Sequence, residues 1–136
     1  MPEQAAVDAA TLAHMGLSAN KALRAAMDKT FDKGQINMLR SVAHQQAVAA
    51  VCPGFAIDAK RFESEMNRIY YDANSKQKVV SRNKLNDLEK TASFGLGLSL
   101  GAQLAIAAYD EKAFCAAAGN ERANSVGKHV IWAVDK

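Results

Sequence analysis

The stretch FGLGLSLGAQLAIAA, residues 94–108, decides the fold because it is uncharged and apolar on nearly every side. With the two residues before it, the stretch approaches the length of a membrane-spanning helix. Gln103, Ser99 and three glycines lower its hydrophobicity, and Asp110 follows where a membrane helix often has Lys or Arg. We interpret the stretch as the buried central helix of a soluble bundle, with a membrane span as the alternative.

The composition of the whole chain predicts further helices around this one. Alanine, the best helix former, occupies 27 of 136 positions, and the two prolines stand at positions 2 and 53. No segment shows the alternation of apolar and polar residues that is typical of a strand. A chain of this length with 49% hydrophobic and 23% charged residues is typical of one globular domain. We therefore predict an all-α fold, a single-domain bundle of five or six helices over residues 1–136.

Residues that start and stop helices delimit the expected elements. Gly16 and the pair 53–54 should end helices, whereas Asp58 and Asp110 are good N-caps. The polar stretch 72–78 is the best candidate for a loop, and the tail 129–134 is either a short helix or an extended strap over the core. The expected helices cover residues 3–15, 18–31, 35–52, 58–71, 81–109 and 110–119.

The charged residues and histidines exclude several classes of function. The net charge of +3 is small and dispersed, which argues against binding to nucleic acid. His14, His44 and His129 lack the local spacing of a metal site, so we interpret them as surface or core histidines. Catalysis needs groups of matched pKa held in contact, and no local spacing places such groups together. We expect no enzymatic activity, no metal and no cofactor.

The two cysteines, Cys52 and Cys115, lie 63 positions apart, each near the end of an expected helix. Their even number and the lack of a CxxC motif favour a structural disulfide over redox or catalytic chemistry. Such a bond would tie the middle of the chain to its end. Two free buried thiols, which behave as small core residues, are the alternative.

Gly97 and Gly101 share one face of the apolar helix because they are four residues apart. Two missing side chains on one face allow another helix backbone to approach closely. We expect close helix packing at this face within the protein. The alternatives are a groove for an apolar ligand and a face for self-association.

Three short motifs carry a resemblance to a known group of proteins. They are VCPGF at residues 51–55, FGLG at residues 94–97 and AFCAA at residues 113–117. Together they resemble small, mostly uncharacterised α-helical periplasmic proteins of alphaproteobacteria that carry one disulfide. The resemblance covers about residues 50–120, and it implies export and a bridge between Cys52 and Cys115. It implies no active-site residues.

The expected location follows from this resemblance and from the first residues of the sequence. The start MPEQ, residues 1–4, has neither the basic residues nor the apolar segment of a signal peptide. A periplasmic location therefore implies that a signal peptide has been removed, and a cytoplasmic protein is the alternative.

The small size, the helical build, the expected disulfide and the lack of a catalytic constellation favour a non-catalytic envelope protein. Such a protein would bind a protein partner, as a chaperone, an inhibitor or an immunity protein does. Rigid amphipathic helices are common recognition surfaces for such partners. The alternative is a carrier that holds a small apolar ligand within the helical core near Gly97 and Gly101.

Overall fold

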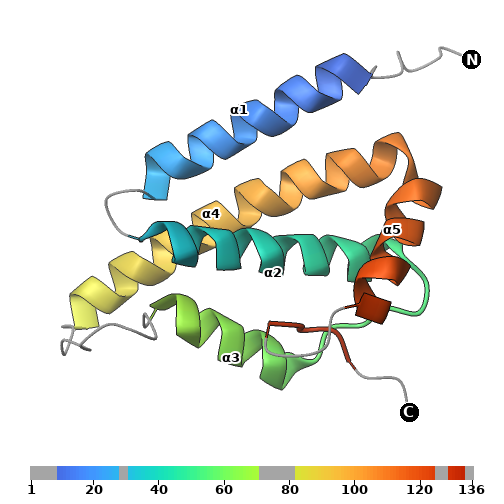
Figure 1. The fold of residues 1–136 in the computed structure, drawn as a ribbon. Coiled ribbons are helices and arrows are strands. Elements are labelled where there is room, and N and C mark those ends of the chain that lie inside the picture. The colour runs from blue at the N-terminus through green and yellow to red at the C-terminus, as the bar shows by residue number, and fades with distance from the viewer. Residues whose placement is uncertain (1–8, 28–30, 71–81, 125–128, 134–136) are drawn as a thin grey trace, which may run out of the picture.

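The computed structural model describes residues 9–27, 31–70, 82–124 and 129–133, and these form five helices (Figure 1). Within these ranges no strand occurs, and a single β-bridge pairs Ile57 with Trp132. The predicted all-α fold is confirmed. The helices are α1 (Ala9–Met27), α2 (Lys33–Val51), α3 (Ala59–Tyr70), α4 (Arg82–Tyr109) and α5 (Glu111–Asn124).

Aspartates begin three of these helices. Asp32 forms a capping box with Gln35, in which each side chain accepts a hydrogen bond from the backbone N–H of the other residue. The Oδ1 atom of Asp58 accepts from the backbone of Arg61, and that of Asp110 accepts from the backbone of Ala113. The predicted caps at 58 and 110 are therefore confirmed.

Two of the predicted helix ends are wrong. α1 runs without a break through Gly16, because a glycine inside a helix costs only about 1 kcal/mol and no proline follows it. Over residues 9–27 the expected helices 3–15 and 18–31 are thus one helix, and Phe31, the expected end of the second, lies outside it. α5 likewise continues past Gly119 to Asn124. The expected loop at 72–78 lies outside the described residues.

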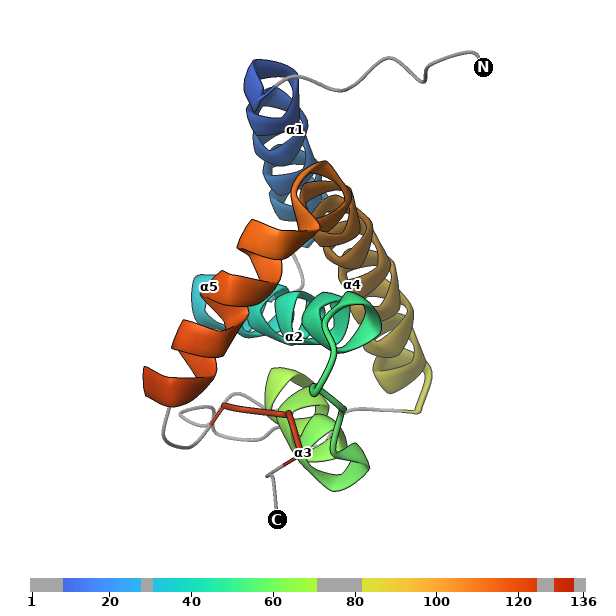
Figure 2. The same cartoon turned by 90° about the vertical axis from the view of Figure 1, so that its right-hand side faces the viewer.

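The helices pack around α2, which contacts α3, α4 and α5 (Figure 2). α1 lies against α4 and runs antiparallel to it, on the side of the molecule away from α3 (Figure 1). The first core cluster joins the C-terminal end of α1 to α2, α3 and α4, and its fully buried members include Leu23, Met27 and Leu39. A second cluster around Val48, Phe114 and Trp132 fills the space between α2, α5 and the C-terminal tail.

The C-terminal tail, residues 129–133, is an extended strap held by Gln45 of α2. The Gln45 side chain donates to the carbonyl of His129 and accepts from the backbone N–H of Ile131, at 2.9 and 2.7 Å. The indole N–H of Trp132 donates to the Gln45 carbonyl. Of the two forms expected for this tail, the strap is the one observed. It buries the side chains of Ile131 and Trp132.

α4 is central in its contacts but poorly buried, so the prediction of a buried central helix is wrong in part. α4 touches all four other helices. By length and composition its residues 86–109 could cross a membrane, yet only 22% of the most apolar window is buried. A soluble core helix is mostly buried, so this helix has an apolar side that the described residues leave uncovered.

Candidate functional site

The uncovered side of α4 forms one wall of an apolar groove whose other wall is α1. The groove has a volume of about 310 Å³ and is open to solvent along one side. Most of the residues that line it are glycine or alanine, and none of them carries a polar side chain. They are Met15, Gly16 and Ala19 of α1, together with Gly97, Leu98, Gly101, Ala102, Ala105 and Ile106 of α4.

The predicted close packing at Gly97 and Gly101 is wrong. A Cβ atom at either position would meet no atom within 4 Å, because both glycines face the open groove. The closely packed glycine is Gly95, whose Cβ would collide with side chains of Met27 and Leu39. The groove that was the alternative for the pair is present.

Large apolar side chains are exposed at and near the groove. Met15 on the α1 wall is 46% exposed, and Phe94 and Tyr109, near the two ends of the α4 wall, are 59% and 45% exposed. Leu17 is exposed on α1 as well. Several exposed apolar side chains beside an apolar groove are typical of an interaction site.

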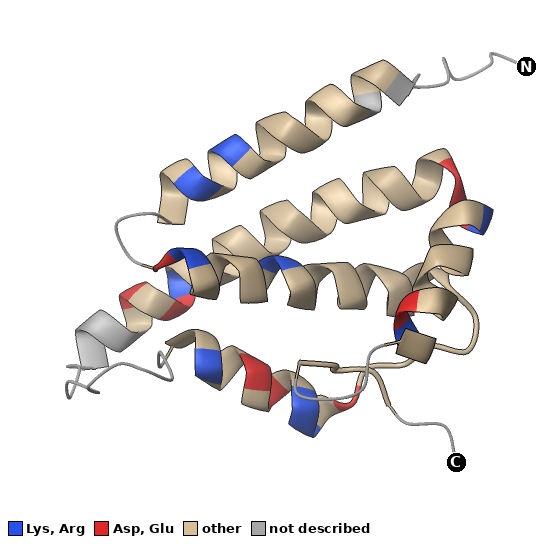
Figure 3. Cartoon of the chain, viewed as in Figure 1, with Lys and Arg blue, Asp and Glu red and all other residues tan. Residues whose placement is uncertain are grey.

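The groove lies in a region without charged side chains (Figure 3). Residues 9–20 of α1 and 91–109 of α4 contain no Lys, Arg, Asp or Glu. Because the two helices are antiparallel, these uncharged segments lie side by side. Exposed charges return only beyond the two ends of the groove, as Lys21 and Arg24 at one end and Asp110 and Glu111 at the other.

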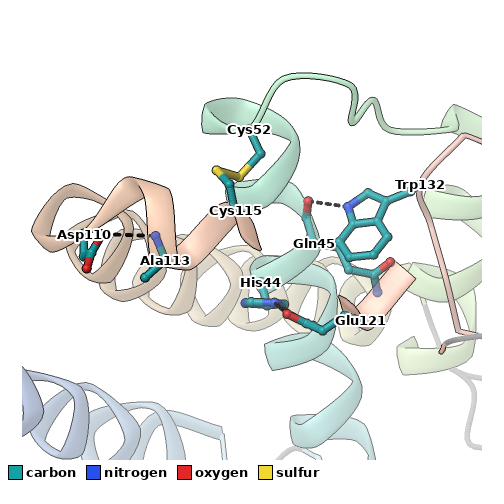
Figure 4. The surroundings of a disulfide bond; sticks show 8 residues. All are labelled: His44, Gln45, Cys52, Asp110, Ala113, Cys115, Glu121 and Trp132. Atoms are coloured by element: carbon teal, nitrogen blue, oxygen red, sulfur yellow. Dashed lines mark hydrogen bonds and ion pairs between the residues drawn. A yellow bond between two sulfur atoms is a disulfide. The ribbon is translucent and has the colours of Figure 1, made fainter. Parts of the chain in front are cut away.

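Two of the three histidines, predicted to stand alone, have carboxylate partners. His44 Nδ1 lies 2.6 Å from Gln103 Oε1. Its Nε2 lies 2.9 Å from Glu121 Oε2, and Figure 4 shows the two side chains pointing toward one another. Both ring nitrogens of His44 are thus engaged, and these two contacts join α2 to α4 and α5. His129 Nδ1 lies 3.0 Å from the buried carboxylate of Glu65, which attaches the strap to α3. These contacts between distant segments gave no local signal in the sequence.

His14 is exposed on α1. Among the described residues, no group of three or more His, Cys, Asp or Glu side chains could hold a metal ion.

The predicted disulfide is confirmed. Cys52 and Cys115 are bonded, with their Cα atoms 5.4 Å apart, and the bond ties the end of α2 to α5 (Figure 4). Beside it, Arg122 of α5 donates to the carbonyl of Gly54, and its guanidinium lies 3.9 Å from the centre of the Phe55 ring. The bridge and these contacts fix the turn after α2.

One titratable group is perturbed outside the groove. Burial, together with the nearby carboxylate of Glu89, raises the pKa of the Tyr70 phenol above its ordinary value of 10.0. Tyr70 is the last residue of α3 and contributes to the first core cluster. Its position is structural, and it lies outside the lining of the groove.

The α1 wall of the groove is the part that sequence reasoning missed. The signal was an uncharged segment, residues 9–20, with small residues at 16 and 19 on one helical face. The expected break at Gly16 concealed this continuity. The chain matches no known protein family, no curated protein sequence and no solved structure.

Proposed function

We propose that this chain is a non-catalytic binding protein, and that the groove between α1 and α4 takes an apolar helix of a protein partner. The observation that carries the proposal is the open, uncharged groove itself, with Met15, Phe94 and Tyr109 exposed at and near it. A helix laid into a hydrophobic groove is a recurring mode of recognition between proteins.

The shape of the groove favours a helix over a small molecule. Sites for small ligands enclose most of the ligand surface, whereas this groove is open along one side. Its lining of glycine and alanine, including Gly97 and Gly101, leaves room for a second helix backbone to approach.

Binding without catalysis is supported by the chemistry of the described side chains. The groove offers no polar group that could activate or orient a reacting atom. Both nitrogens of His44 are already engaged with Gln103 and Glu121, so this imidazole has no nitrogen left to act on an external substrate.

We further propose that the protein works in an oxidising compartment, such as the bacterial periplasm. The support is the disulfide between Cys52 and Cys115, since structural disulfides persist in oxidising compartments and are rare in the cytosol.

The test is the binding of a labelled, Leu- and Ala-rich helical peptide of about five turns, followed by fluorescence anisotropy. We expect saturable binding to the wild-type chain and loss of binding in Gly101→Leu, because the leucine occupies the groove while its Cβ meets no atom of the protein within 4 Å. Gly119→Leu is the matched control. Gly119 is also an exposed helical glycine with free space around its Cβ, but it lies on α5 away from the groove.

The outcomes of this titration separate the proposal from its alternative. Equal binding by both leucine variants would place the peptide elsewhere and refute the proposal. The second candidate, a carrier of a small apolar ligand, is favoured by the groove volume of about 310 Å³, which reaches the lower end of ligand pockets. One fatty acid bound per chain and lost in Gly101→Leu, with no peptide binding, would support the carrier.

A further inference from the structure

We propose that the groove binds a second copy of this chain, so that two α4 helices cross antiparallel about a two-fold axis at Gly101. The inference rests on the proposed function, since it uses the same groove and names what occupies it when no other partner is present.

The two exposed aromatic residues of α4 lie at nearly equal distances along the helix on either side of Gly101. Phe94 lies seven residues before it and Tyr109 eight residues after it, separations close to two helical turns, and both side chains are exposed. A two-fold axis at Gly101 therefore brings Phe94 of one copy to the Tyr109 end of the other. Each glycine removes a side chain where the two backbones cross, and Gly97, one turn earlier, does the same.

The charges at the two ends of the groove are complementary under this symmetry. Lys21 and Arg24 are exposed beside Leu23, which reaches Gly95 at the Phe94 end, whereas Asp110 and Glu111 are exposed directly after Tyr109. In a dimer with two-fold symmetry both copies use the same surface, so the first end of the groove in one copy lies against the second end in the other. The basic end of each copy thus faces the acidic end of the other, which favours this register.

The remaining exposed charges near these ends do not reverse this pattern. The first end keeps a net positive charge when three charged residues of α4, Asp87, Glu89 and Lys90, are counted together with the two basic residues of α1. Lys112 leaves the second end net negative, because two acidic residues precede it. The described ends therefore keep opposite signs.

A second copy fits this surface better than a lipid bilayer does. A charged side chain is costly inside a bilayer, and Asp110, Glu111 and Lys112 form an exposed charged corner where α4 ends. Insertion of the apolar end of α1 and α4 would carry that corner into the hydrocarbon. A surface with two acidic residues at one end is also a poor match for an anionic membrane.

The first measurement is the mass of the full, disulfide-bonded chain by sedimentation velocity over a range of micromolar concentrations. We expect twice the mass of one chain. Gly101→Arg should give the monomer, because the axis sets two cations against each other at the crossing, while open space around the residue preserves the fold. Gly119→Arg, on an exposed face of α5, should remain dimeric.

The second measurement is a charge-reversal cycle that only contact between copies can satisfy. Lys21→Glu with Arg24→Glu, or Glu111→Lys alone, should each weaken the dimer by on the order of tenfold. Their combination should recover most of the affinity. The two groups of charges lie at opposite ends of one groove, so coupling within a single chain is screened.

The results separate this inference from the function on which it rests. A chain that is monomeric at every concentration but still binds the helical peptide would overturn the self-pairing and leave the proposed function standing. A dimer that survives Gly101→Arg, or effects of charge reversal that simply add, would place the contact on another face and overturn the inference. If self-pairing holds, rising peptide concentration should convert the dimer into a peptide-bound monomer.

Discussion

Replacing Gly95 with alanine is the sharpest test of how α1 packs on α4. The added Cβ atom would collide with the Met27 sulfur, and it would lie 2.8 Å from Leu39 Cδ2 and 3.0 Å from Leu23 Cδ1. All three neighbours are fully buried, so they have little space into which to move. The same substitution at Gly119 meets no atom within 4 Å and serves as the matched control.

The magnitude follows from two opposing effects. Alanine favours a helix over glycine by about 0.8–1.0 kcal/mol, and this gain applies equally at Gly95 and Gly119. Overpacking a well-filled core costs about 1–3 kcal/mol, and the adaptable thioether of Met27 favours the lower part of that range. We therefore expect Gly119→Ala to gain about 1 kcal/mol and Gly95→Ala to lose up to about 2 kcal/mol. The gap between the two variants is about 1–3 kcal/mol.

The assay is thermal unfolding of both variants with the disulfide intact, followed by circular dichroism. For a chain of this size the expected gap corresponds to roughly 3–5 °C in melting temperature for each kcal/mol. If Gly95→Ala is as stable as Gly119→Ala, then α1 does not cover Gly95, and the groove between the two helices loses its structural basis.

Three further predictions concern the rest of the fold. Replacing Cys52 and Cys115 with serine should lower the free energy of unfolding by about 4 kcal/mol in the chain-entropy account, and wild-type stability in that variant would contradict it. Gln45→Leu leaves the Ile131 N–H without its acceptor, so we expect a loss of about 1–3 kcal/mol and red-shifted emission from the single tryptophan. Folded Tyr70 keeps its proton at a pH where the unfolded chain has lost it. The contribution of Tyr70 to the free energy of unfolding should therefore be complete below pH 10.0 and be lost as the pH rises through the folded pKa. Tyr70→Phe should remove this pH dependence.

The parts of the fold that local chemistry controls were predictable from the sequence. The caps at Asp58 and Asp110 depend on a side chain and the three residues that follow it, so the sequence contains the whole interaction. The bond between Cys52 and Cys115 was accessible for a different reason, since two cysteines allow only one pairing within the chain.

Contacts between distant segments could not be predicted in this way. The clamp of Gln45 on the strap joins residues separated by more than eighty positions. The pairing of His44 with Glu121 depends on the relative rotation of two helices. Neither contact changes the local pattern of apolar and polar residues, so each remains hidden until the helices are placed in space.

Only part of the groove could be predicted from the sequence, and the three glycines of α4 show why. Gly95 and Gly97 are two residues apart, which places them on opposite sides of a helix, so both cannot pack against the buried core. The choice between them requires the orientation of the helix, which an amphipathic pattern normally supplies. Here the segment is apolar all round, so that pattern is absent, and buried Ala92 and Ser99 mark the inner side only in the structure. Such a helix in a small bundle has more apolar surface than its neighbours can cover. Complete burial therefore does not explain its uniform apolarity, whereas the partner that we propose on the side of Gly97 and Gly101 would cover the exposed part.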